Sequence, residues 1–390
     1  MTASLGKRIG WLNTEGLLRL WLLVLAPLSY LFFVYNLVLD YRAGGHSWKQ
    51  GDWLINGQNG PVRRSFAGDV ILPMSDALAM DPVLLVIVVQ VVVVALVYVL
   101  SLRLALSAGG AAPLILALSP AFFMAFWVTD PLGSARKEML AFAALLLFAQ
   151  GVIRPSLVWT ALGCALFLVA AAAHEALLLF LPVFWGVLCL APGTPGARGK
   201  VVLLSLTSTA ALLLFLSAMG SSRVEDFMTV CAPLLERGVA EHMCQGAIRW
   251  LEYDAVHGFD FVYSRTTPEL MFWFLLAYAA SVAPFAYVAY LTDARRLCAA
   301  LIILPFLLFL PLFAVSTDHG RWISFHVFAA FLLFAVAIRL GRVRLVRRLN
   351  AFLLTGLFVA AQLIAPMHVR DVYFGGPVAR VWEEARALLP

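Results

Sequence analysis

Charged residues are scarce in this chain of 390 residues: they make up 13% of it, whereas 63% of the residues are hydrophobic. Soluble domains are about half apolar and about a quarter charged, so this composition excludes an ordinary soluble protein. The mean hydropathy of +0.91 fits a protein that crosses a membrane several times. The formal net charge of +6 does not indicate a nucleic-acid partner, because the basic residues are spread over many loops.

The sequence also lacks metal-ligand spacings, a cleavable signal sequence and an internal repeat. The five cysteines do not follow the spacing of a metal site. The first apolar run, residues 17–39, is too long for the core of a signal peptide, and no small-residue cleavage site follows it. Without a repeat, nothing supports a transporter built from inverted halves. We therefore expect one integral membrane domain over residues 1–390.

Apolar runs dominate the chain, and they predict an all-α fold with about eleven membrane helices. The runs are residues 17–39, 82–105, 111–128, 138–154, 157–173, 176–192, 201–219, 269–291, 297–315, 323–340 and 350–366. Two of them, 157–173 and 176–192, are short enough to be half-helices or a re-entrant pair.

The distribution of charge predicts the orientation of these helices. Lys7 and Arg8 precede the first run, and basic residues in short loops favour the cytoplasmic side. Basic residues are equally numerous on the two sides, so the assignment depends on the short loops. Alternation then places all but Glu15 and Asp293 of the 22 acidic residues on the outer face. The polar clusters described next all fall on that face.

The first outer loop, residues 40–81, is rich in glycine, amide and charged side chains. Asp52 is a candidate general base, because a loop carboxylate can take a proton from an attacking hydroxyl. Asp40 is an alternative base or simply the last polar residue of the first helix. Arg63 and Arg64 carry guanidinium groups that suit phosphate, although adjacent side chains point apart and an interfacial anchor is an equal alternative.

The second outer cluster joins Asp130 to a basic and acidic helix start. Arg136, Lys137 and Glu138 open the next apolar run, where a glutamate is costly unless it is paired. An arginine or lysine at that depth can pair with Glu138 and also bind a diphosphate. The alternative is an ion pair that serves the helix start alone.

Two further clusters are compact. His174 and Glu175 lie between two apolar stretches, where ionisable residues indicate function, and no second histidine follows to make a zinc motif. Asp318, His319 and Arg321 belong to a predicted short turn with Trp322, in which Arg321 can hold phosphate. A plain interfacial turn is the alternative for each cluster.

Loop 220–268 is the second large outer segment. Cys231 and Cys244 lie in it, and an oxidising compartment would permit a disulfide between them. Its end is aromatic, which indicates either an interfacial helix or a wall that stacks on sugar rings or a lipid tail. The aromatic residues are Trp250, Tyr253, Phe259, Phe261 and Tyr263.

Taken together, these stretches resemble GT-C type membrane glycosyltransferases of bacterial surface-polysaccharide loci and the related polysaccharide polymerases. The segments that carry the resemblance are residues 51–56 (GDWLIN), 60–64 (GPVRR), 130–138 (DPLGSARKE), 174–175 (HE) and 318–322 (DHGRW). The resemblance implies a polyprenyl-phosphate sugar donor and a catalytic acid early in the first outer loop, which is Asp52 or Asp40. It implies a second acid in the next outer loop, Asp130. The segment after residue 366 is shorter than the soluble domain of larger members, which leaves acceptor recognition to loop 220–268.

The expected activity is an inverting transfer of a sugar to a glycan or lipid-linked acceptor at the periplasmic face of a bacterial inner membrane. The predicted phosphate-binding residues are Arg63, Arg64, Arg136, Lys137 and Arg321, and the supporting residues are Glu138, His174, Glu175, Asp318 and His319. The sequence identifies no definite cofactor; Asp52 and Asp130 offer oxygen ligands to a divalent metal, but no spacing demands one. The alternatives are a Wzy-like polymerase of lipid-linked repeat units and a flippase or transporter of a lipid-linked glycan. The scarcity of charge inside the spans argues against proton-coupled transport.

Overall fold

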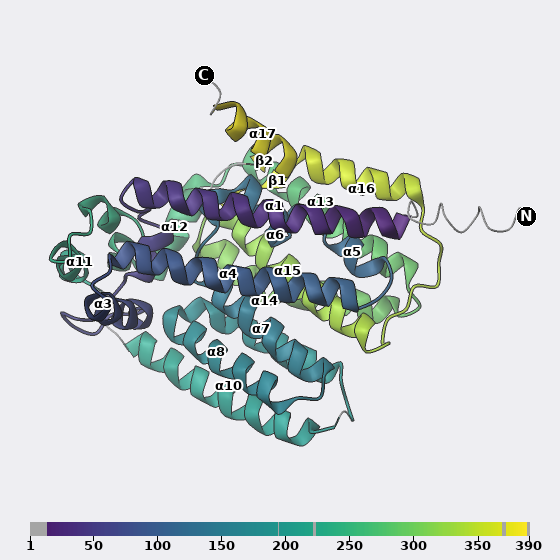
Figure 1. Ribbon diagram of the computed structural model, residues 1–390, viewed down its shortest axis with the longest axis horizontal. Helices are drawn as coiled ribbons and strands as arrows, with labels where there is room; N and C mark the ends of the chain where they lie inside the picture. Colours follow the sequence, from purple (N-terminus) through teal and green to yellow (C-terminus); the bar gives the residue numbers. More distant parts are fainter. Residues whose placement is uncertain (1–13, 194, 221–223, 369–371, 388–390) are drawn as a thin grey trace, which may run out of the picture.

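The chain folds into a bundle of helices, as a computed structural model shows for residues 14–193, 195–220, 224–368 and 372–387 (Figure 1). In this described part, six helices are long and apolar enough to cross a membrane. They are α1 (Thr14–Arg42), α4 (Pro82–Ser107), α10 (Ala197–Gly220), α13 (Pro268–Leu291), α14 (Arg295–Val315) and α15 (His319–Arg339). The all-α membrane class predicted from composition is therefore confirmed.

Shorter elements complete the bundle. The shorter apolar helices are α7 (Glu138–Ile153), α8 (Leu157–Ala173), the pair η3 (Glu175–Phe180) and α9 (Leu181–Cys189), and α16 (Ala351–Leu363). The remaining helices are α2 (Lys49–Trp53), α3 (Phe66–Leu78), α5 (Ala112–Leu116), α6 (Phe123–Thr129), η2 (Pro131–Gly133), α11 (Met228–Leu235), η4 (Glu241–Gln245), η5 (Arg249–Glu252), α12 (Ala255–Arg265) and α17 (Pro377–Ala387). In the described residues the single sheet is an antiparallel pair, β1 (Ala365–Pro366) with β2 (Val372–Tyr373).

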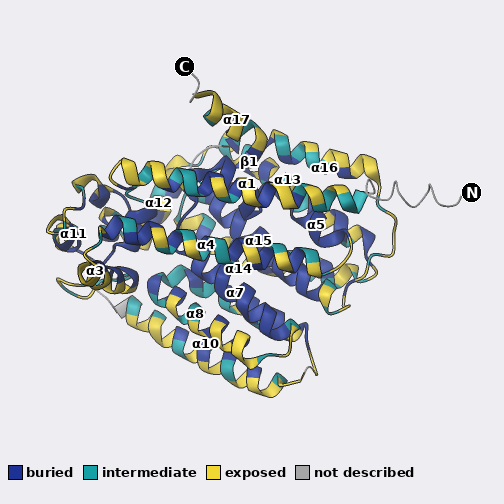
Figure 2. Ribbon diagram, in the orientation of Figure 1, coloured by how far each residue is buried: buried dark blue, intermediate teal, exposed yellow. Residues whose placement is uncertain are grey.

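The centre of the bundle is formed by α7 and α15, which are buried on all sides (Figure 2). Phe142 of α7 stacks on Phe328 of α15 with ring centroids 3.8 Å apart. A helix that is apolar all round is expected at such a position. These two helices carry Glu138 and Arg321 at their first turns, so the rigid centre of the molecule positions the site.

The periphery exposes large apolar side chains. Leu31 of α1, Leu213 of α10 and Phe352 of α16 are each more than half exposed. Contiguous exposed apolar surface on helices of this length is what contact with lipid requires. Figure 2 shows the same pattern as exposed stripes along α1, α10 and α16.

The predicted run 111–128 is not a single helix, so that expectation is wrong. It divides into α5 and α6 around a turn that contains Ser119 and Pro120. Proline lacks the amide hydrogen of a helix and restricts the residue before it. Within this turn, the Ser119 hydroxyl donates to the carbonyl oxygen of Ser281 in α13 at 2.8 Å. The expected run 176–192 also divides, into η3 and α9, between Phe180 and Leu181.

The predicted turn at residues 317–322 is also corrected. His319 to Trp322 form the first turn of α15, which begins before the expected position 323. The sequence predicted that Gly320 permits a tight turn, whereas the structure requires glycine because the backbone of Met367 lies close to it. The amide of Gly320 donates to the carbonyl oxygen of Met367 at 3.1 Å, and a β-carbon would collide with that backbone.

The polar segments gather at one end of the bundle. In Figure 1, α3, α11 and α12 lie together at the left, and the connections at the right are those around α5 and between α15 and α16. At the right-hand end, Thr292 bridges to Leu345 and the Arg342 side chain donates to the carbonyl oxygen of Leu190. Lys7 and Arg8, on which the predicted orientation depends, lie outside the described residues.

Candidate functional site

Asp52 is held by a short helix that dips into the bundle. The side chain of Asp52 is buried. The neighbouring Trp53 fixes the helix in place, because its indole N–H donates to the carbonyl oxygen of Ala135 at 3.2 Å. Gly51 permits this placement, since a β-carbon there would lie 2.9 Å from the carbonyl oxygen of Met243. The predicted loop therefore contains α2, and α2 aims Asp52 inward.

Lys137 is the cation nearest to Asp52. Its Nζ lies 3.7 Å from Asp52 Oδ1 and donates at 3.0 Å to the carbonyl oxygens of Arg64 and Ala173. Burial acts to raise the pKa of Asp52, but the charges of Lys137 and other cations outweigh it and hold that pKa below its usual value. Asp52 is therefore ionised at physiological pH. Lys137 is fully buried and positions Asp52, rather than facing a ligand as predicted.

Arg64 and Glu175 form a bidentate pair across the site. Three hydrogen bonds of 2.5–3.0 Å join the Arg64 guanidinium to the Glu175 carboxylate. The backbone of Arg64 has a φ of 68°, a left-handed conformation that costs a non-glycine residue about 1–3 kcal/mol. Such strain is common where a site fixes a side chain, and here it accompanies an Arg64 carbonyl directed at Lys137.

His174 lies beside this pair and is neutral. Its Nδ1 accepts a hydrogen bond from the amide of Ala176 at 3.2 Å. Burial, followed by the positive charge of Arg64, lowers the pKa of His174 to about 3. A neutral imidazole can donate one hydrogen bond and accept another, but it does not add charge to the site.

Arg321 is paired with two acids at the first turn of α15. It donates to both oxygens of Glu138, at 3.2 and 3.0 Å, and also to Asp318. The predicted pairing of the costly Glu138 is thereby found, but its partner is Arg321 rather than the adjacent Arg136 or Lys137. The carboxylates of Glu138 and Asp318 compensate the charge of Arg321 and fix the orientation of its guanidinium group.

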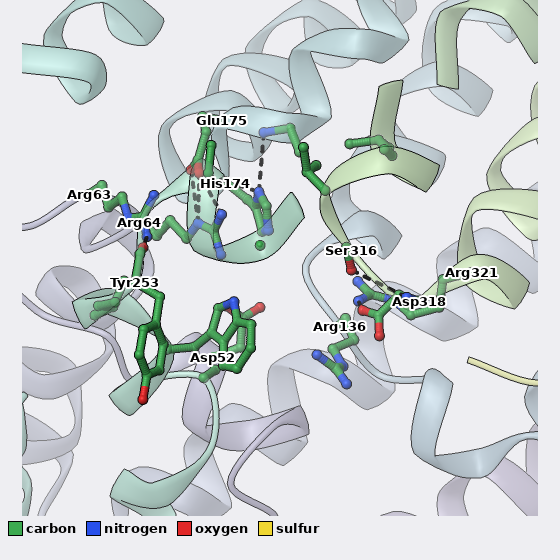
Figure 3. A pocket seen from close by; sticks show the side chains of 18 of the residues that line it. Asp52, Arg63, Arg64, Arg136, His174, Glu175, Tyr253, Ser316, Asp318 and Arg321 are labelled. Atoms are coloured by element: carbon green, nitrogen blue, oxygen red, sulfur yellow. Dashed lines mark hydrogen bonds and ion pairs between the residues drawn. The ribbon is translucent and has the colours of Figure 1, made fainter. Parts of the chain in front are cut away.

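These side chains meet around a cavity of about 500 Å³ at the polar end of the bundle. Figure 3 shows Arg64, His174 and Glu175 on one side, Arg136, Asp318 and Arg321 on the other, and Asp52 between them. Arg63 also lines the cavity and donates to the carbonyl oxygen of Tyr253 at 2.8 Å. The four polar clusters expected on one face are therefore brought to one cavity.

Besides Lys137 and Glu138, three predicted residues do not line the cavity. Asp40 lies 2.5 Å from the ammonium group of the buried Lys49 and is not part of the cavity wall. Asp130 is fully buried and accepts from the backbone amide of His368, whose ring Nδ1 lies 2.8 Å away. His319 packs on the rings of Phe274 and Phe313. Asp40 and Asp130 are structural in this arrangement, and they do not share a wall with Asp52.

An aromatic wall lines the cavity beside the charged residues, with the guanidinium of Arg136 5.3 Å from the ring centre of Trp48 and that of Arg321 5.1 Å from the ring centre of Trp322. It consists of Trp48, Trp250, Tyr253 and Trp322. Trp250 contacts Tyr253 edge to face, with centroids 5.0 Å apart. Flat aromatic faces next to charged groups suit the apolar face of a sugar ring or an isoprenoid chain.

The aromatic wall is braced by a disulfide between Cys231 and Cys244. The disulfide joins α11 to η4, and the amide of Ala247 donates to the carbonyl oxygen of Ser47 at 3.1 Å, next to Trp48. This pairing was left open by the sequence, which showed only that the two cysteines share a loop.

Sequence reasoning missed Trp48, Lys49, Gln90 and His368. Gln90 of α4 donates to the carbonyl oxygens of Lys49 and Ala135, which ties α2 to the loop that carries Arg136. The polar Gln90 within an apolar run was a visible signal of such a contact. His368 had no local signal, because its partner Asp130 lies 238 residues earlier.

Comparison with protein-family models, curated proteins and solved structures found no match. In the described part of the chain, no group of three or more histidine, cysteine, aspartate or glutamate side chains is placed to hold a metal ion.

Proposed function

We propose that this protein is a membrane glycosyltransferase that moves a sugar from a polyprenyl-phosphate-linked donor to a hydroxyl of a glycan or lipid-linked acceptor. One observation carries the proposal. The buried, ionised Asp52 lies on the wall of a cavity of about 500 Å³ that is also lined by Arg63, Arg64, Arg136 and Arg321 and by aromatic rings. A carboxylate, several cations and an aromatic wall meet the needs of a base, a phosphate leaving group and a sugar.

In the proposed reaction the acceptor oxygen bonds to the anomeric carbon while the bond from that carbon to the phosphate oxygen breaks. The hydroxyl proton passes to Asp52, and the polyprenyl phosphate leaves with the electron pair. A carboxylate of lowered pKa is a weak base, so the proton moves late, after bonding to carbon has made the hydroxyl acidic. The arginines stabilise the charge that develops on the leaving phosphate.

The disulfide supports a proposal for the side of the membrane to which the cavity opens. Disulfides persist in oxidising compartments, and the Cys231–Cys244 bridge lies at the same end as the cavity. We therefore propose that the cavity opens to the periplasmic face of a bacterial inner membrane. The finer GT-C architecture belongs to the same proposal: among the described residues, six long and four shorter apolar helices coincide with ten of the eleven expected spans, and the remaining one, residues 111–128, is divided between α5 and α6.

The test is the synthesis of surface glycan in a strain that lacks the gene and is complemented at matched protein levels. We expect Asp52→Asn to lower glycan by about 10²- to 10⁴-fold, the range for loss of a general base. Asp260→Asn is the matched control, because Asp260 is exposed on α12 and away from the cavity.

The products separate the alternative activities. A new glycosidic bond formed by single sugars supports the glycosyltransferase, whereas joining of whole lipid-linked units indicates a polymerase. Movement of an intact lipid-linked glycan without bond formation indicates a flippase. Full glycan with Asp52→Asn at normal protein level would overturn the proposed role of Asp52.

A further inference from the structure

A second, smaller cavity adjoins the main one. It has a volume of about 270 Å³ and includes Phe261 of α12, Thr317 and His368, none of which lines the main cavity. The two cavities share one wall, which is made of Trp48, Arg136, Trp250, Val315, Ser316 and Asp318. Asp52 lines the main cavity and not the smaller one. Arg136 is the cation at the junction.

Arg136 differs from Arg64 and Arg321 because it lacks an acidic partner among the described residues, and it differs from Arg63 because Arg63 donates to the carbonyl oxygen of Tyr253. Its side chain is 7% exposed, its Nε has no hydrogen-bond partner, and its guanidinium lies 5.3 Å from the ring centre of Trp48. Arg64 is paired with Glu175, whereas Asp318 is engaged by Arg321. A buried cation left unpaired is costly, and an anionic ligand would remove that cost.

We propose that Arg136 binds the phosphate of the donor at the junction, with the sugar in the main cavity and the first isoprene units in the smaller cavity. This inference rests on the proposed function and assigns a subsite to each part of the donor. A phosphodiester has two substituents, and an anion site between two cavities allows one substituent to enter each.

The chemistry fixes which substituent enters which cavity. The anomeric carbon must lie within reach of an acceptor hydroxyl that Asp52 can deprotonate, so the sugar belongs in the main cavity. Phe261 adds an apolar ring that lines the smaller cavity and not the main one, and together with Val315 and the two tryptophans of the shared wall it suits hydrocarbon.

The first experiment measures binding of a polyprenyl phosphate without a sugar to the purified full-length protein in nanodiscs. We expect Arg136→Gln to weaken binding by about 10- to 100-fold, the equivalent of losing charged hydrogen bonds. Arg103→Gln, at an exposed position of α4 outside both cavities, should bind as the wild type does. Unliganded Arg136→Gln should unfold at the same or a higher temperature, because it removes an unpaired buried charge.

A second pair of variants tests the isoprenoid subsite. Phe261→Trp reduces the space in the smaller cavity, so it should weaken binding of the polyprenyl phosphate by at least about tenfold while leaving competition by inorganic phosphate at Arg136 unchanged. Tyr263→Trp is the control, because Tyr263 lies on the exposed side of α12. Equal binding by Phe261→Trp and Tyr263→Trp would overturn the assignment of the smaller cavity.

The outcomes separate this inference from the proposed function. If the wild type binds no polyprenyl phosphate and transfers no sugar, the proposed function fails. If the wild type transfers sugar but Arg136→Gln binds the lipid phosphate normally, the inference fails and the function stands. If inorganic phosphate binds at Arg136 but polyprenyl phosphate does not, the ligand of Arg136 is a free phosphate and the inference of a lipid phosphate fails.

Discussion

Lys137 links stability and chemistry at the scale of the residue. Its ammonium group compensates Asp52 at the buried wall of the cavity. Lys137→Met leaves that carboxylate without its nearest cation, and losing one partner of a buried pair costs about 3–5 kcal/mol. We expect a lower temperature of thermal unfolding in detergent for Lys137→Met.

The double variant provides the control for this prediction. Asp52→Asn in the Lys137→Met background removes the uncompensated charge, so part of the lost stability should return while sugar transfer stays absent. If the effects of the two substitutions on the free energy of unfolding simply add, the two groups are not coupled as the structure indicates.

The sequence identified many of the residues that meet at the cavity, because ionisable groups beside apolar helices are visible locally. It did not identify their partners. Asp40 and Asp52 are equivalent candidates in the sequence, and the difference is that Asp40 is neutralised by Lys49 whereas Asp52 faces the cavity. Such a difference depends on how α1, α2 and α7 pack, and no local pattern contains it.

At the scale of the element, the disulfide should determine how firmly the aromatic wall is held. It closes a loop with a sequence separation of 13 residues. A cross-link of that length stabilises a protein by about 3 kcal/mol in the chain-entropy model. We expect the double variant Cys231→Ala/Cys244→Ala to unfold at a lower temperature than the wild type and to lose sugar transfer as the wall loosens.

Reducing agent provides a check without mutation. It should lower the unfolding temperature of the wild type but not that of the double variant. Cys189→Ala is the control, since Cys189 is a free and exposed cysteine. An equal response of wild type and double variant to reduction would show that the bridge does not stabilise this loop.

Helix positions were predicted best where an apolar run is uninterrupted, as for α1, α4, α13 and α14. The errors have identifiable causes. Pro120 divided an apolar run whose hydropathy alone suggested one helix, and the polar start of α15 hid the first turn of a buried helix. Hydropathy measures transfer to lipid, so it does not register helix breaks inside a protein core or polar residues that have protein partners.

For the whole molecule, the hairpin segment after α16 joins the last part of the chain to the first half. His368→Ala removes the ring that meets Asp130, and Asp130→Ala removes the acceptor. We expect either variant to speed cleavage by added protease between residues 366 and 380, because the segment is held less firmly. The double variant should be cleaved no faster than the single variants; a further increase would mean that the two residues act separately.

The same contact bears on how the protein is made in the cell. Asp130 emerges from the ribosome 238 residues before His368, and in the finished protein it is fully buried. Until the later segment is synthesised, that carboxylate lacks the amide and imidazole that compensate it. The order of synthesis therefore makes this contact at the cavity end of the bundle a late one, and truncated chains that stop before Met367 would lack it.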